Sequence, residues 1–141
     1  MSPSAPILIV DDDADDIFIL KRLLLKAGIK NKTVAFEDPR IAVAHLEAVV
    51  ARGDPNLLPC LTFTDLHMPQ MNGVEFTRWI RQQPPLDRLC VVMVSSSEDP
   101  RDAARAVEAG VSRFALKYPA ASALRQIVDA SPCTNASLSS P

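Results

Sequence analysis

Short apolar runs alternate with longer segments of mixed polarity along this chain. Five runs rich in Val, Leu, Ile, Phe and Thr have the length of buried strands and cover residues 7–10, 33–36, 60–64, 90–94 and 113–116. Apolar runs in alternation with amphipathic segments are typical of a parallel sheet with helices on its faces. The pattern therefore predicts an α/β fold.

The segments between the runs carry the signals of helices. In the first segment, apolar residues 17, 20 and 24 follow helical spacing before Gly28 ends the pattern. The second and fourth helices are expected to open at Asp38-Pro39 and Asp99-Pro100, because Asp is a good N-cap and Pro suits the first helical position. The third and fifth are expected at about residues 72–82 and 120–130. Five strands alternating with five helices predict a flavodoxin-like doubly wound sheet with strand order 2-1-3-4-5.

Length and composition indicate one globular domain. The chain has 141 residues, of which 48% are hydrophobic, enough for a sizeable core. We expect the domain to cover residues 1–130 and the Ser/Pro-rich segment 131–141 to form a flexible tail. Three widely spaced cysteines, without a CxxC pair, predict neither a disulfide framework nor a zinc site.

Charge and hydropathy argue against two classes of partner. The formal net charge is -2, and the Lys and Arg residues are scattered, which argues against direct nucleic-acid binding. No apolar stretch approaches the roughly 20 residues of a membrane helix, and residues 1–6 do not resemble a signal peptide. The sequence predicts a soluble cytoplasmic protein without membrane contact.

The residues that follow the predicted strands are chemically selective. Asp11 and Asp12 follow the first strand, Asp65 the third, Ser95 the fourth and Lys117 the fifth. In open parallel sheets the carboxyl ends of the strands share one edge, where ligands bind. Carboxylate oxygens suit Mg²⁺, which commonly bridges protein carboxylates and phosphate oxygens. These residues predict a site for Mg²⁺ and a phosphoryl group.

The acidic run at residues 11–16 contains more carboxylates than such a site needs. Like charges about 4 Å apart repel by ~4 kcal/mol at an effective dielectric near 20, so a divalent cation would relieve Asp11 and Asp12. Asp13, Asp15 and Asp16 are expected to be an N-cap and solvated charges at the positive end of the first helix.

Several motifs in order resemble the receiver domain of bacterial two-component response regulators over roughly residues 5–130. They are VDDD at the first strand end, TDLHMPQMNGVEF, VSSSEDP and FALK. The resemblance implies that Asp65 accepts the phosphoryl group, and that Asp11, Asp12, Asp65 and the backbone carbonyl of His67 hold Mg²⁺. It implies that Ser95 binds a phosphoryl oxygen and that Lys117 pairs with the phosphoryl charge. It also implies that Ser95 and Phe114 act together as the switch.

One residue departs from the family pattern. The family usually has proline directly after the lysine, joined by a cis bond, whereas here Tyr118 separates Lys117 from Pro119. Cis bonds are strongly disfavoured before residues other than proline. The loop is therefore expected to hold Lys117 differently.

The resemblance implies a single-domain response regulator in a phosphorelay. Its donor would be a sensor histidine kinase or a phosphotransfer protein, and it would catalyse only its own phosphorylation and dephosphorylation. The chain ends soon after the fifth helix, so a downstream protein or a homodimer is the expected output. Two alternatives stay open: a degenerate receiver that binds a partner without phosphorylation, and a Mg²⁺-dependent phosphohydrolase that uses Asp65 as nucleophile.

Overall fold

The computed structural model of the chain describes residues 5–131. Within this range five strands form one parallel sheet in the order β2-β1-β3-β4-β5, as the sequence predicts. The strands are β1 (Ile7–Val10), β2 (Thr33–Phe36), β3 (Leu61–Thr64), β4 (Cys90–Ser95) and β5 (Arg113–Leu116). The predicted tail, apart from Ser131, lies outside the described residues.

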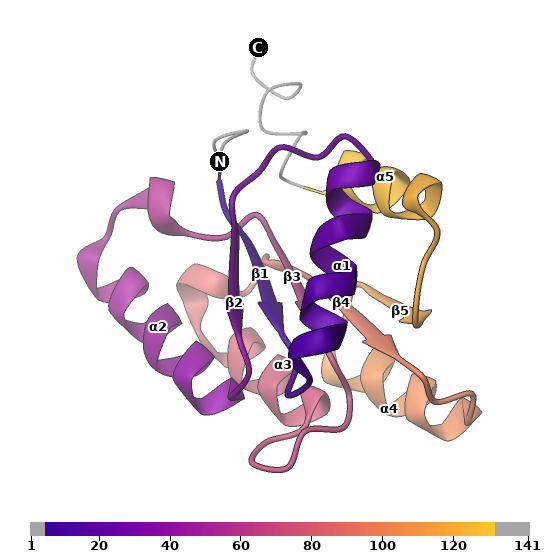
Figure 1. Ribbon diagram of the computed structural model, residues 1–141. Coiled ribbons are helices and arrows are strands. Elements are labelled where there is room, and N and C mark those ends of the chain that lie inside the picture. The colour runs from indigo at the N-terminus through magenta and orange to yellow at the C-terminus, as the bar shows by residue number, and fades with distance from the viewer. Residues whose placement is uncertain (1–4, 132–141) are drawn as a thin grey trace.

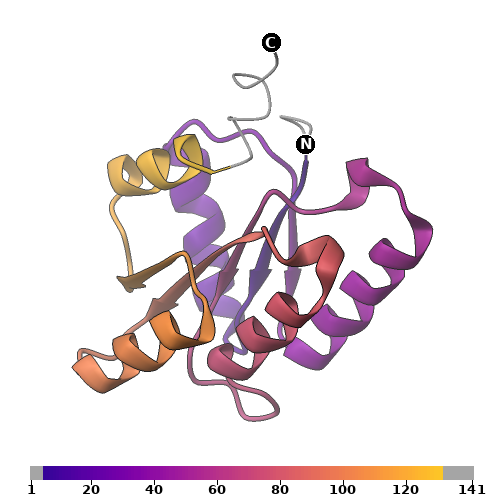
Figure 2. The same ribbon diagram turned by 180° about the vertical axis from the view of Figure 1, so that it is seen from behind.

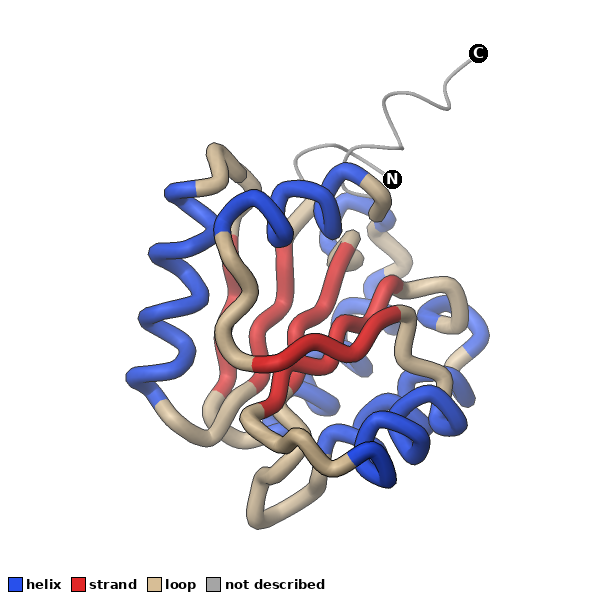
Figure 3. The backbone as a smooth tube through the Cα atoms, turned by 90° about the vertical axis from the view of Figure 1, so that its right-hand side faces the viewer, coloured by secondary structure: helices blue, strands red, loops and turns tan. Residues whose placement is uncertain are grey.

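Five α-helices cover the two faces of the sheet (Figures 1 and 2). They are α1 (Ala14–Lys26), α2 (Pro39–Arg52), α3 (Gly73–Gln82), α4 (Pro100–Ala109) and α5 (Ala121–Asp129). Helices α1 and α5 lie on one face, and α2, α3 and α4 lie on the other. The side view shows the sheet between these two layers (Figure 3). This is the doubly wound arrangement that the alternation predicts.

The helix-start signals act as the sequence indicates. Asp38 and Asp99 are the N-caps of α2 and α4, and each side chain accepts a hydrogen bond from the backbone N–H two residues later. Asp13 caps α1 in the same way. The boundary differences are small, since β3 begins one residue later than expected and β4 continues through Ser95.

Two apolar layers hold the helices on the sheet. On the first face, Leu20 and Leu24 of α1 and Leu124 of α5 pack against the buried side chains of β1, β3 and β4. On the second face, Leu46 of α2 and Phe76 of α3 pack against Leu8 and Val10 of β1 and Val91 of β4. Burying an aliphatic or aromatic side chain of this size contributes about 1.5–3 kcal/mol. The strands are therefore fixed from both sides, and so are their carboxyl ends.

Two further sequence expectations concern the cysteines and membrane-spanning helices. Cys90 is a free thiol, as expected, but Cys60 is disulfide-bonded, so the prediction of no disulfide is wrong for that residue. None of the helices within residues 5–131 is long and apolar enough to span a bilayer.

Candidate functional site

Parallel pairing brings the first two acidic strand ends together. Val10, the last residue of β1, is in register with Thr64, the last residue of β3. The backbone N–H of Asp65 donates to the carbonyl of Val10 at 2.9 Å. Asp11 and Asp65 therefore leave the sheet side by side, and both are buried. Their positions are set by the sheet ladder rather than by a flexible loop.

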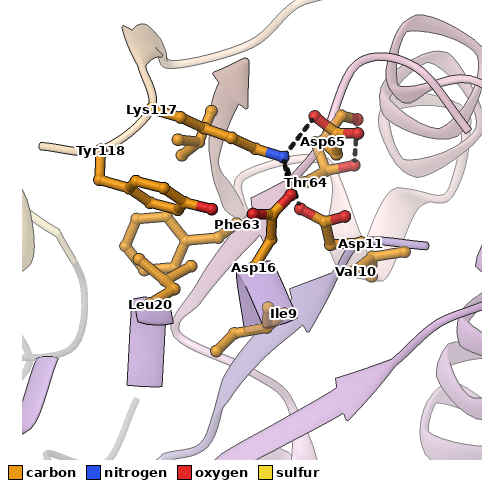
Figure 4. Close-up of a pocket in the computed structure, with 11 residues that line it drawn as sticks. Ile9, Val10, Asp11, Asp16, Leu20, Phe63, Thr64, Asp65, Lys117 and Tyr118 are labelled. Atoms are coloured by element: carbon orange, nitrogen blue, oxygen red, sulfur yellow. Dashed lines mark hydrogen bonds and ion pairs between the residues drawn. The ribbon is translucent and has the colours of Figure 1, made fainter. Parts of the chain in front are cut away.

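Lys117 reaches across the sheet edge to three carboxylates (Figure 4). Its Nζ lies 2.6 Å from Asp16 Oδ2, 2.9 Å from Asp11 Oδ2 and 3.2 Å from Asp65 Oδ1. The Lys117 side chain is 12% exposed. Buried charge-assisted hydrogen bonds of this kind are short and strong. Lys117 thus stands beside Asp65, as the sequence predicts.

The pKa values of Asp11, Asp65 and Lys117 are shifted by burial and by the crowding of several carboxylates around one ammonium group. Burial raises the pKa of Asp11 from 3.8 to about 6, although the Asp13 backbone N–H and Lys117 oppose the shift. Burial likewise raises the pKa of Asp65 against the pull of Lys117. For Lys117 itself burial acts to lower the pKa, but its hydrogen bonds to Asp16 and Asp11 outweigh that effect and raise it. The site therefore has an excess of negative charge that one lysine does not neutralise.

Three of the carboxylates also form a group that fits a small divalent cation. One oxygen each from Asp11, Asp12 and Asp65 lies within 4.8 Å of the others. Asp12 is exposed, so the group opens to solvent on one side. An all-carboxylate donor set with an open side suits Mg²⁺, which keeps several waters. The residues fit the cation that the sequence predicts.

The fourth predicted Mg²⁺ ligand is the backbone carbonyl of His67. Its ring Nε2 lies 3.8 Å from Asp102 Oδ2 on α4, and its side chain is largely exposed. The metal contact expected from the sequence involves the backbone carbonyl of His67 rather than its ring, and this stays a prediction.

Ser95 ends β4 as a buried residue whose hydroxyl already has a local partner. The backbone N–H of Ser97 donates to Ser95 Oγ at 3.1 Å. Ser97 Oγ in turn donates to Asp102 Oδ2 at 2.5 Å. A chain of hydrogen bonds thus runs from Ser95 to the first turn of α4. The binding of a phosphoryl oxygen by Ser95 stays a prediction.

Phe114 lies on β5 opposite Met93 of β4. It is partly buried and packs against an apolar cluster between the sheet, α3 and α4, formed by Leu66, Val74, Met93, Ala106 and Ala109. The helix α4 contributes two alanines to this cluster, so few apolar atoms hold it there. Because Phe114 packs against this cluster, a change in its packing would alter the contacts of α4 with the sheet. The switch role of Phe114 stays a prediction.

Gly73 allows the start of α3 to lie close to the residues that follow β3. A Cβ at this position would lie 2.2 Å from the carbonyl oxygen of Asp65. The backbone N–H of Gly73 donates to the carbonyl of Leu66 at 2.8 Å. Only glycine permits this close approach of the helix to the acceptor strand end. The motif around Asp65 therefore needs a residue without a side chain here.

The structure corrects one assignment in the acidic run. Asp13 is an N-cap and Asp15 is exposed, as expected. Asp16 was expected to be a solvated charge, but it is the nearest partner of Lys117. Its position at the third residue of α1 directs it toward the strand ends rather than toward solvent. Because the contact joins residues 101 positions apart, only knowledge of the fold reveals it.

Tyr118 stands where the family usually has proline, yet Lys117 still reaches the carboxyl ends of the strands. The peptide bond between Lys117 and Tyr118 is cis, although Tyr118 is not proline. Tyr118 lines the same small pocket as Lys117, together with Phe63 and Leu20 (Figure 4).

Comparisons with known proteins agree with the fold and with the motifs. A family model described as response regulator receiver domain matches residues 7–129. Chemotaxis protein CheY-3 of Vibrio cholerae is 30% identical over 129 residues, which cover 92% of each chain. The solved receiver domain of a signal transduction histidine kinase from Syntrophus aciditrophicus matches with a TM-score of 0.75 and 29% identity, covering 94% of this chain and 91% of that one.

Other matches differ in how much of their own length this chain covers. The structure of the phosphorylated cyanobacterial phytochrome response regulator RcpA matches with a TM-score of 0.71 and 27% identity over 88% of each chain. Two further relatives are much longer: the chain spans 9% of hybrid signal transduction histidine kinase C of Dictyostelium discoideum and 16% of protein RcaC of Microchaete diplosiphon. The domain thus occurs both in short proteins and within large ones.

Proposed function

The chain belongs to the response regulator receiver domain family, a family of phosphorylatable signalling domains, and on that premise we propose that it accepts a phosphoryl group on Asp65. The donor is a sensor histidine kinase or a phosphotransfer protein. The observation that carries the proposal is the position of Lys117 Nζ, 3.2 Å from Asp65 Oδ1 at an edge shared with Asp11.

The transfer itself is a displacement at phosphorus. A carboxylate oxygen of Asp65 forms a bond to phosphorus while the bond between phosphorus and the donor nitrogen breaks, and the donor imidazole keeps the electron pair. Asp65 is suited to this role because it is held rigidly at the end of a buried strand. Lys117 offers a positive charge to the oxygens that become more negative during transfer.

Asp11, Asp12 and Asp65 would hold Mg²⁺, with the His67 carbonyl as a further ligand. When bound, Mg²⁺ supplies charge that neutralises the carboxylates and the phosphoryl oxygens. The carboxylate of Asp12 faces solvent, so the cation can enter from that side. The raised pKa of Asp11 indicates how unfavourable the negative charge is in the absence of a cation.

The signal would pass through β4 and α4. If Ser95 turns toward a phosphoryl oxygen, its hydroxyl leaves the Ser97 backbone N–H, and the linked contact between Ser97 and Asp102 is disturbed. Phe114 can then repack beside α4. The surface that changes would bind a downstream protein or a second copy of the chain in the cytoplasm.

Intact mass tests the proposal. The protein is incubated with Mg²⁺ and acetyl phosphate, with Asp65→Asn as the matched variant. We expect one labile phosphoryl group on the wild type and none on the variant, because Asn offers no nucleophilic carboxylate. Omission of Mg²⁺ should strongly reduce the uptake.

Other results would point to the alternatives. Absence of both uptake and Mg²⁺ binding would contradict the proposal and favour a degenerate receiver that binds its partner unphosphorylated. Sustained multiple turnover on a phosphomonoester would instead favour the phosphohydrolase.

A further inference from the structure

Lys117 has more carboxylate partners than its expected role requires. An ammonium has three N–H donors, and the three carboxylates of Asp16, Asp11 and Asp65 are all in contact with it. The contact with Asp16 is the shortest, at 2.6 Å. Receiving a phosphoryl group at Asp65 gives no reason for this third partner on α1.

Asp16 differs from the other two partners in what else it can bind. Asp11 and Asp65 belong to the group of three carboxylates whose oxygens lie within 4.8 Å of one another, and Asp16 does not. A cation held by that group takes up charge from Asp11 and Asp65 and weakens their attraction for Lys117. Among the carboxylates of residues 5–131 that contact Lys117, Asp16 is then the one whose full charge is still available to it.

The backbone around Asp16 makes it a firm support. Asp16 is the third residue of α1, in the first turn after the N-cap Asp13. The helix is fixed to the sheet by Leu20 and Leu24, which are buried. The side chain of Asp16 is 21% exposed, so solvent competes only in part for its contact with Lys117.

We infer that Asp16 is a positioning residue that holds Lys117 Nζ beside the Asp65 carboxylate, both before and after the cation binds. This deepens the proposed function and rests on it for its role in phosphoryl transfer. Lys117 Nζ contacts Asp16 on α1 and Asp11 just after β1, and its third contact is with Asp65, where the phosphoryl oxygens arrive. A misplacement of such a group by about 1 Å can slow a reaction as much as 100-fold.

The test compares Asp16→Asn with Asp15→Asn. Asn at position 16 keeps the shape of the side chain and loses its charge. Asp15 lies in the same helical turn, is exposed and has no contact with Lys117 among the described ion pairs. Its substitution removes the same charge from the same helix end, so it controls for the long-range field and for the helix dipole.

The first readout is the rate constant of phosphorylation by acetyl phosphate at saturating Mg²⁺. We expect Asp16→Asn to be about tenfold slower than wild type and Asp15→Asn to stay within twofold. The far-UV circular dichroism of both variants should match wild type, because a folding defect would lower the amount of reactive protein and not the rate constant of the folded molecules.

The second readout is the mobility of the Lys117 side chain from NMR relaxation at saturating Mg²⁺, where Asp11 and Asp65 are shared with the cation, with the signal assigned by its loss in Lys117→Gln. We expect a restrained side chain in wild type and in Asp15→Asn, and a mobile one in Asp16→Asn. A rate constant for Asp16→Asn equal to that of Asp15→Asn, or a Lys117 that stays restrained, would overturn the inference. If wild type takes up no phosphoryl group, the proposed function fails, and the mobility still decides whether Asp16 holds Lys117.

Discussion

Asp11 shows how a single buried carboxylate stores unfavourable charge at this site. Its pKa is raised to about 6 in the folded chain, against 3.8 as its usual value. The folded state therefore binds more protons than the unfolded state between these values, and stability falls as the pH rises through that interval. Above pH 6, a pKa raised by about two units lowers the free energy of unfolding by about 3 kcal/mol.

Asp11→Asn should therefore stabilise the metal-free protein at pH 7.5 by about 1–3 kcal/mol, since the variant carries no buried charge there. At pH 5 most of the difference should vanish, because Asp11 of the wild type is then largely protonated. Urea unfolding in EDTA at both pH values measures this, and the exposed Asp15→Asn serves as the control. A variant less stable than wild type at pH 7.5 would mean that the contact with Lys117 outweighs burial.

The same residues mark the limit of what the sequence predicts. Asp11, Asp65 and Lys117 follow apolar runs, so the rule that parallel strands end at one edge is enough to bring them together. Asp16 follows no strand, and an Asp in the first turn of a helix already has an ordinary explanation as a favourable partner of the helix dipole. Its contact with Lys117 depends on how α1 is rotated on the sheet, which local patterns do not determine.

At the scale of elements, the junction of β3 and α3 depends on Gly73. The helix begins so close to the acceptor strand that a Cβ would collide with the Asp65 carbonyl oxygen. Relief of the collision requires α3 to move away from the sheet or the end of β3 to shift. Either movement displaces the backbone that carries Asp65, so stability and phosphorylation are linked at this junction.

Gly73→Ala is expected to destabilise the fold by about 1–3 kcal/mol, as overpacking does in well-packed interiors, and to slow phosphorylation of Asp65. Gly53→Ala is the matched control, because Gly53 has a φ of 67° but a Cβ added there would meet nothing within 4 Å. Its cost in stability should come from backbone strain alone, about 1–2 kcal/mol, with no effect on phosphorylation.

Chemical denaturation and the acetyl phosphate assay test both variants. Normal phosphorylation of Gly73→Ala would show that the site tolerates the displacement.

The elements themselves were predictable where local chemistry determines them. Asp38-Pro39 and Asp99-Pro100 mark helix starts because capping and a fixed proline φ are local effects. The cis bond at Lys117 could not be predicted, because residues other than proline favour trans by their own chemistry. The close approach at Gly73 was also missed, since the collision that excludes a side chain involves a strand several residues earlier.

For the molecule as a whole, negative charge is concentrated at one edge of the sheet. Asp11, Asp12, Asp16 and Asp65 together with Lys117 carry three net negative charges, whereas the whole chain carries -2. The rest of the molecule is therefore close to neutral. A cation that binds there relieves repulsion among these carboxylates in the folded state, so its effect should appear in global stability and not only in activity.

Mg²⁺ should therefore raise the free energy of unfolding, by about 2.7 kcal/mol at a concentration 100 times its Kd. Thermal unfolding across a Mg²⁺ titration measures this, with KCl at equal ionic strength as the control, because screening of exposed charges acts without a specific site. Asp12→Asn should need more Mg²⁺ for the same stabilisation, since it removes one ligand at the open side of the group. Asp15→Asn should follow the wild-type curve. Equal stabilisation by KCl and Mg²⁺ would mean that the acidic edge attracts ions diffusely and that the three carboxylates do not act as ligands.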